Sequence, residues 1–191
     1  MLRVVTAVVV SACWCVFAVA LLSRRPERSS GTKRDAASIY GLVLQLLSYG
    51  TLLIGWHSPL PGFRTATPTL QLFVALLTMS LAVISVSFFI AALKALGKEW
   101  SLTARVLEGH RLVRSGPYRV VRHPIYTAML GLLIATGITF SRWQLLLASV
   151  TVFLIGTFIR IRTEDKLLRQ VFGAEFEVYQ LKVPAIIPGI Y

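Results

Sequence analysis

The side chains best suited to chemistry lie in a polar stretch, residues 109–126, between long apolar runs. This stretch contains two of the three histidines in the chain, four arginines and two tyrosines. Backbone polar groups outside a helix are not tolerated in lipid, so the stretch must lie in water or line an enclosed cavity. Within it, Arg122-His123-Pro124-Ile125-Tyr126 places an imidazole and a phenol at a predicted helix start, where unpaired N–H groups favour an anion. We therefore expect a site for a polar, partly anionic small molecule at the membrane surface.

Two charged residues farther along the chain permit two interpretations. Arg160 follows an apolar run directly, and Glu164 comes four residues later on the same face of a predicted helix. They form either a headgroup anchor with a surface ion pair, worth about 0.3 kcal/mol, or part of the polar site. The second interpretation rests on the high cost of placing a charge near lipid, which makes such residues candidates for function.

Other kinds of site find little support in the sequence. His110 and His123 are separated by thirteen positions with no carboxylate between them, and we expect no metal site. The chain has no glycine-rich phosphate loop and no serine nucleophile elbow. Its net charge of +12 is better explained by basic loops facing anionic lipid headgroups than by nucleic-acid binding. Cys13 and Cys15 lie in an apolar run, where we expect helix packing instead of a disulfide.

The elements that must position these residues are apolar helices. The chain of 191 residues is 55% apolar and only 15% charged, and about 20 apolar residues suffice to cross a bilayer. The fold class is therefore an all-α integral membrane protein with about five transmembrane helices. The predicted segments are Val4–Leu22, Ala36–Trp56, Pro68–Leu96, Pro124–Phe140 and Trp143–Ile159.

The region after the fifth segment is amphipathic. Residues 160–172 have apolar side chains at helical spacing, and Gly173 is a plausible helix stop. A second short helix is predicted over 174–182, ended by Pro184. We expect this end of the chain to lie on the membrane surface and to close over the site.

The distribution of basic residues predicts the orientation. Of the 20 lysines and arginines, only Arg3, Arg64 and Arg142 fall on one side of the five-segment arrangement. The positive-inside rule then places the N-terminus outside and the C-terminal region in the cytoplasm. We expect a multi-pass protein of a bacterial inner membrane.

An ordered set of motifs resembles the isoprenylcysteine carboxyl methyltransferase family, within a wider group of membrane methyltransferases. The resemblance extends over roughly residues 100–188. It is carried by His110-x-Leu112-Val113, Gly116-Pro117-Tyr118, Arg122-His123-Pro124-x-Tyr126, Glu164-Asp165, Phe172-Gly173, Tyr179 and Val183-Pro184. The first two helices carry no family signal. From its length we expect one membrane domain, residues 1–191, in which 1–67 supply two N-terminal helices and 68–191 form the methyltransferase core with a cytoplasmic cofactor-binding region.

The resemblance implies S-adenosylmethionine as the methyl donor. The residues that match cofactor-binding positions are His110, Arg111, Leu112, Val113, Tyr118, His123, Pro124, Ile125, Tyr126 and Glu164. Arg160 matches an arginine placed toward the acceptor and is the predicted catalytic residue. The implied partner is a lipophilic substrate that enters sideways from the bilayer, while the donor enters from the cytoplasm.

The predicted acceptor is a lipophilic carboxylate. A carboxylate is ionised at neutral pH and needs no general base, only placement and partial desolvation. An amine acceptor would need to lose a proton, and His123 is a weak candidate for that base. Three positions depart from the family pattern and leave the identity of the acceptor open: Ala128, Asp165 and Ala185.

The sequence leaves three alternatives to a carboxyl methyltransferase open. A phospholipid or amine N-methyltransferase would use the same donor with a different acceptor. A membrane reductase would bind NADPH and no S-adenosylmethionine. A membrane scaffold would bind neither cofactor.

Overall fold

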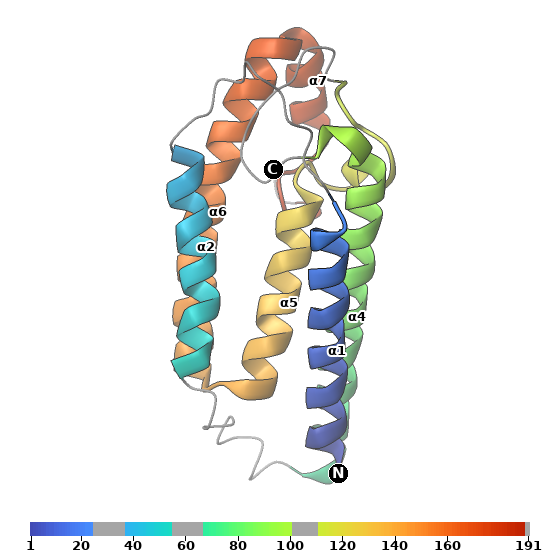
Figure 1. The fold of residues 1–191 in the computed structure, drawn as a ribbon, viewed down its shortest axis with the longest axis vertical. Coiled ribbons are helices and arrows are strands. Elements are labelled where there is room, and N and C mark those ends of the chain that lie inside the picture. The colour runs from blue at the N-terminus through green and yellow to red at the C-terminus, as the bar shows by residue number, and fades with distance from the viewer. Residues whose placement is uncertain (25–36, 55–66, 101–110, 190–191) are drawn as a thin grey trace.

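The computed structural model describes residues 1–24, 37–54, 67–100 and 111–189, and this part of the chain is helical without a β-strand (Figure 1). The α-helices are α1 (Leu2–Leu22), α2 (Ala37–Ile54), α4 (Pro68–Leu96), α5 (Pro124–Phe140), α6 (Trp143–Phe172) and α7 (Ala174–Lys182). Two short 3-10 helices, η1 (Gly97–Glu99) and η2 (Gly116–Arg119), lie between α4 and α5. The all-α prediction is confirmed.

Local sequence signals explain several helix ends. Pro68 and Pro124 occupy the first turns of α4 and α5, where the missing N–H of proline has no cost. The Thr67 side chain also accepts a hydrogen bond from the Leu70 N–H and caps α4. Gly97 and Gly173 end α4 and α6 with φ angles of 56° and 50°, a region that favours glycine.

The helix α6 differs from the sequence prediction in its length. The fifth apolar segment was predicted to end at Ile159, with an amphipathic piece after it. Instead, α6 runs without interruption for 30 residues to Phe172. Hydropathy changes at Arg160, but no proline or glycine interrupts the chain between Gly156 and Gly173, so the backbone hydrogen bonds continue. The apolar and polar parts of α6 are therefore one rigid element.

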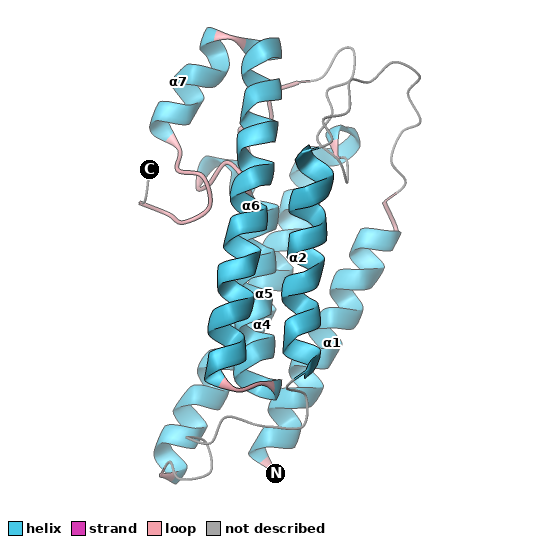
Figure 2. Ribbon diagram, turned by 90° about the vertical axis from the view of Figure 1, so that its left-hand side faces the viewer, coloured by secondary structure: helices cyan, strands magenta, loops and turns pink. Residues whose placement is uncertain are grey.

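The helices pack as two layers that share α5. On one side α2 runs along α6, and on the other α4 packs against both α1 and α5 (Figures 1 and 2). Phe17 of α1 stacks on Phe89 of α4 with ring centroids 4.1 Å apart. Trp14 donates a 2.9 Å hydrogen bond to Thr136 of α5, which joins α1 to α5.

Glycines allow α2 and α6 to approach closely. A Cβ added at Gly41 would lie 2.5 Å from Cγ of Arg160 and 2.7 Å from the carbonyl oxygen of Gly156. One turn away, the Gln45 side chain donates a 2.8 Å hydrogen bond to Thr157, which joins α2 to α6. Ser48 bonds instead to the Gln45 carbonyl within α2. The stem of Arg160 is thus held against the α2 backbone.

Within the described residues, three helices are long and apolar enough to cross a membrane: α1, α4 and α6. The apolar helices Ser38–Ile54 and α5 are shorter. All five carry the apolar character expected of an integral membrane protein, and large apolar side chains cover much of the outer surface of α1, α2 and α4. The five-span arrangement remains a prediction, as does the cytoplasmic location of the C-terminal region.

Candidate functional site

The charged residues of the sequence motifs gather where α5 begins and where α6 leaves its apolar part. His123 is the N-cap residue of α5, since Pro124 starts the helix directly after it. Glu164 and Asp165 project from α6 toward it. We call His123, Tyr126, Arg160, Glu164 and Asp165 the charged cluster.

His123 bridges the two neighbouring carboxylates. Its Nδ1 lies 3.3 Å from Oε2 of Glu164 and its Nε2 lies 2.9 Å from Oδ1 of Asp165. Imidazole can donate from both nitrogens only in its protonated form. Burial alone would lower the pKa of His123, but the hydrogen bonds to Asp165 and Glu164 and the charges of both carboxylates outweigh it and raise that pKa to about 9. His123 is therefore a buried imidazolium at neutral pH.

Tyr126 connects Arg160 to Glu164. Arg160 donates from Nε to the Tyr126 hydroxyl at 2.8 Å, and that hydroxyl donates in turn to Oε1 of Glu164. Nη2 of Arg160 also lies 3.5 Å from the same carboxylate oxygen. Two contacts fix the orientation of a guanidinium that would otherwise move freely on its long stem. Arg160 is buried, so the interpretation of Arg160 and Glu164 as a headgroup anchor with a surface ion pair is wrong.

The rings of the charged cluster are layered. The His123 and Tyr126 rings stack with centroids 5.6 Å apart and planes 15° apart. Cζ of Arg160 lies 5.3 Å from the centroid of the Tyr126 ring. This arrangement places a cation on each side of a phenol, with Glu164 between them as the shared acceptor.

The C-terminal tail pairs with the backbone in front of α5. The N–H groups of Arg122 and His123 donate to the carbonyl oxygens of Pro184 and Ala185, at 2.8 and 2.9 Å. Thr127 donates a 2.6 Å hydrogen bond to the Ile186 carbonyl. The tail therefore lies against the start of α5.

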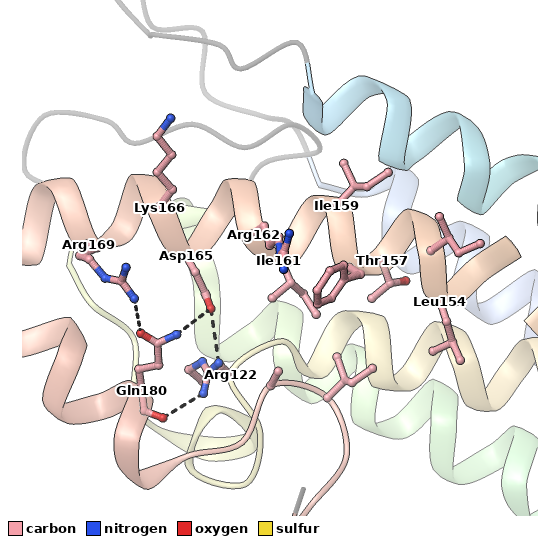
Figure 3. Close-up of a pocket in the computed structure, with 14 residues that line it drawn as sticks. Arg122, Leu154, Thr157, Ile159, Ile161, Arg162, Asp165, Lys166, Arg169 and Gln180 are labelled. Atoms are coloured by element: carbon pink, nitrogen blue, oxygen red, sulfur yellow. Dashed lines mark hydrogen bonds and ion pairs between the residues drawn. The ribbon is translucent and has the colours of Figure 1, made fainter. Parts of the chain in front are cut away.

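Arg122 fastens this tail to α6. Its guanidinium lies 3.3 Å from Oδ2 of Asp165 and donates to the carbonyl oxygens of Gln180 and Val183 (Figure 3). The Gln180 side chain donates to Asp165 at 3.3 Å and accepts from Arg169 at 2.7 Å. Asp165 therefore has two roles, because one oxygen holds His123 and the other holds the Arg122 clamp.

Tyr118 and Tyr179 join η2 to α7. The Tyr179 hydroxyl donates a 2.6 Å hydrogen bond to the Tyr118 carbonyl, and burial raises the pKa of Tyr179 to about 12. The buried Tyr118 phenol has its pKa raised by burial first and then by the charge of Glu164. Tyr118 therefore belongs to the surroundings of Glu164.

The structure brings together only some of the residues predicted from sequence. Tyr126, His123, Glu164 and Arg160 are in direct contact, and Tyr118 lies near them. The other predicted residues do not contact this group in the described hydrogen bonds and ion pairs. Pro124 is buried in the first turn of α5, and Arg111 is exposed. Three more are half-buried: Ile125, Leu112 and Val113. His110 lies outside the described residues, as does His57.

Three residues of the site were not predicted to have a role. Asp165 was noted in the sequence only because it departs from the family pattern. Arg122 was noted only as part of the motif that contains His123. Gln180 had no sequence signal. No three His, Cys, Asp or Glu side chains within the described ranges form a group that could hold a metal ion.

Comparisons with known proteins place these residues in a family. A sequence model of the isoprenylcysteine carboxyl methyltransferase family matches residues 75–170, which include the whole charged cluster. Two proteins of Oryza sativa, from subspecies indica and japonica, are each 37% identical to the chain over 82 residues and are named probable protein-S-isoprenylcysteine O-methyltransferase. The alignment spans 42% of this chain and 42% of each relative. By the extent of the family match, the chain belongs to the isoprenylcysteine carboxyl methyltransferase family.

Proposed function

We propose that the protein transfers a methyl group from S-adenosylmethionine to the carboxylate of a lipophilic acceptor, such as an S-prenylated cysteine. The observation that carries this proposal is the charged cluster, a buried arginine held by Tyr126 and Glu164 at the end of an apolar helix. The family membership and the names of the rice relatives support the same reaction class.

The residues of the cluster fit the donor. S-adenosylmethionine carries an ammonium group, a sulfonium and ribose hydroxyls, which all seek a carboxylate or another acceptor. Glu164 is less buried than its neighbours, with 23% of its side chain exposed, and a carboxylate accepts up to about four hydrogen bonds. The exposed part of Glu164 is where we expect the donor to bind. When bound, the donor supplies an electrophilic methyl group on sulfur.

Arg160 fits the acceptor carboxylate. The apolar part of α6 ends directly before it, so the head of a lipophilic acid in the bilayer would arrive at its depth. A guanidinium binds a carboxylate through charge-assisted, often bidentate hydrogen bonds. Because Tyr126 and Glu164 already orient Arg160, little ordering is needed when the acceptor binds.

The charged cluster contains no free base for an amine acceptor. Both nitrogens of His123 face carboxylate oxygens and carry protons, so this imidazole has no lone pair to take another. Glu164 and Asp165 are held in ion pairs with His123. An ionised carboxylate needs no base, so the cluster favours a carboxylate acceptor over an amine.

A transfer assay tests the proposal. The detergent-purified protein is incubated with methyl-labelled donor and, in parallel, an N-acetylated S-prenylcysteine or phosphatidylethanolamine. We expect label in the prenylcysteine, released by mild base as methanol because it is an ester. Label only in the amine lipid, stable to base, would contradict the carboxylate assignment.

A further inference from the structure

A second feature of α6 lies beside the charged cluster. A cavity of about 750 Å³ opens along the helix, between its outer face and the C-terminal tail (Figure 3). The helix contributes Leu154, Ile155, Phe158, Arg162, Lys166 and Arg169 to its wall. The tail contributes Ala185 and Ile186. We call this feature the α6 groove.

The α6 groove shares Asp165 with the charged cluster, and this carboxylate is already paired with Arg122 and His123. Neither Arg160, Glu164 nor Tyr126 lines it. An α-helix turns about 100° per residue, so Phe158 and Arg162 each lie roughly 160° around α6 from Arg160. An acceptor held by Arg160 would therefore occupy another face of the helix. The groove needs an occupant of its own.

The two halves of the α6 groove differ in character. Toward the middle of α6 the wall is formed by Leu154, Ile155 and Phe158, which are exposed apolar side chains. Toward the end of α6 it is formed by the exposed basic residues Arg162, Lys166 and Arg169. Asp165 also lines this half, and its charge is offset by the ion pair with Arg122. Residues 155, 158, 162, 166 and 169 are three or four apart, so they make one continuous stripe along the helix.

The change from apolar to basic residues marks the level where hydrocarbon meets the headgroups. Basic side chains gather at that level and face anionic headgroups. Cζ of Arg162 lies 4.2 Å from the centroid of the Phe158 ring, so this cation is held at the junction of the two halves. Arg122, which also lines the groove, adds a positive wall beside the tail.

We propose that the α6 groove binds an anionic phospholipid. One acyl chain lies along Leu154, Ile155 and Phe158 against Ile186, and the phosphate group lies at Arg162 and Lys166. The apolar half excludes a small free anion as the full ligand, and the basic half selects against a zwitterionic headgroup. This site does not rest on the methyl-transfer proposal, because Arg160, Glu164 and Tyr126 do not line the groove.

The test is equilibrium binding of a fluorescent-tailed phosphatidylglycerol to the delipidated full chain in a nonionic detergent, read by anisotropy. Phosphatidylcholine with the same tail and glycerol 3-phosphate serve as competitors. We expect saturable binding, with phosphatidylcholine competing at least tenfold more weakly and glycerol 3-phosphate failing to displace the lipid. S-adenosylhomocysteine should also fail to displace it, whether or not the protein is a methyltransferase.

Matched variants locate the site. The double variant R162Q/K166Q should weaken phosphatidylglycerol binding at least tenfold. The control R24Q/R119Q removes the same charge from residues that do not line the groove, and it should change the affinity less than twofold. Equal losses in the two variants, equal affinity for both lipids in the unmodified protein, or displacement by glycerol 3-phosphate would each overturn the proposal.

Discussion

At the scale of single residues, the protonated His123 determines the geometry of the charged cluster. It holds Glu164 on one side and Asp165 on the other, so it sets how these carboxylates present their remaining lone pairs. Arg160 reaches the same Glu164 from the opposite direction through Tyr126. Loss of the proton from His123 would therefore loosen two helices at once.

Stability should depend on pH through His123. The pKa of His123 in the folded protein, about 9, is above its ordinary value of about 6.5. Its contribution to stability is therefore complete below about pH 6.5 and is lost as the pH rises through 9. We expect the melting temperature in detergent to fall over this interval, and to fall less in His123→Gln. Parallel pH profiles in the two proteins would contradict the buried imidazolium.

Arg160 should affect turnover more than donor binding. Arg160→Lys keeps the charge but loses the planar fork that contacts Tyr126 and Glu164 together. We expect kcat to fall at least tenfold with the donor Kd changed less than about threefold, as for an interaction made mainly with the acceptor. Arg142→Lys, at the far end of α6, is the matched control. Normal turnover in Arg160→Lys would show that the acceptor lies elsewhere.

Local spacing predicts only part of the charged cluster. Arg160 and Glu164 are four apart, so helical geometry alone places them on one face. The contacts of His123 with both Glu164 and Asp165 join residues more than forty positions apart, and they depend on how α5 and α6 are rotated against each other. Periodicity contains no information on that rotation, which explains why Asp165 had no assigned role.

At the scale of elements, the α2–α6 contact positions Arg160. Gly156→Ala would place a Cβ 2.7 Å from the Gly41 carbonyl oxygen and 2.8 Å from Cβ of Leu44, where neither backbone can yield easily. We expect a loss of about 1–3 kcal/mol in stability, the usual range for overpacking, with reduced turnover as Arg160 shifts. Unfolding in mixed micelles measures the first effect and the transfer assay the second.

Gly50→Ala is the control for this prediction. Gly50 also lies in α2, but a Cβ added there meets no atom of the described residues within 4 Å. Alanine is also the better helix former, so stability should be unchanged or rise by up to about 1 kcal/mol. Equal behaviour of Gly156→Ala and Gly50→Ala would mean that the two helices do not meet through Gly41 and Gly156.

The Arg122 clamp should control how tightly the tail is held. Arg122→Gln removes the ion pair with Asp165 and the hydrogen bonds to the Gln180 and Val183 carbonyls. We expect amide hydrogen exchange at His123, whose N–H donates to the Ala185 carbonyl, to rise at least tenfold. Arg114→Gln, which loses an exposed pair with Glu175, should leave this exchange unchanged. Unchanged exchange in Arg122→Gln would contradict the clamp.

Helix ends were predicted well where a proline or a glycine marks them in the sequence. Proline and glycine mark the start and end of α4 and the end of α6, and the observed bounds agree. The prediction ended the fifth apolar segment at Ile159 and placed an amphipathic helical stretch after it. The structure joins the two in one helix, because hydropathy reports the surroundings of a helix and not its backbone. The pairing of α2 with α6 across more than a hundred residues had no local signal beyond small residues and Gln45.

At the scale of the whole molecule, the polar chemistry is concentrated at one end of an apolar bundle. The start of α5, the polar part of α6, η2 and the tail after α7 meet there, while the end of α5 and the start of α6 lie at the opposite end (Figure 1). α6 belongs to both regions: Arg160 and Glu164 of the charged cluster lie on one face, the basic stripe of the α6 groove lies on another, and Asp165 borders both. This arrangement suits an enzyme whose donor comes from water and whose acceptor comes from lipid.

The most direct test of this account is calorimetric titration of the detergent-purified protein with S-adenosylmethionine and with its demethylated product. We predict saturable binding of both, weakened at least tenfold by Glu164→Gln and unchanged by Glu177→Gln, an exposed carboxylate of α7. Thermal melting establishes that each sample is folded. A folded protein that binds neither compound, or that binds them equally well with Glu164→Gln, would contradict the assignment of the charged cluster as the methyl-donor site.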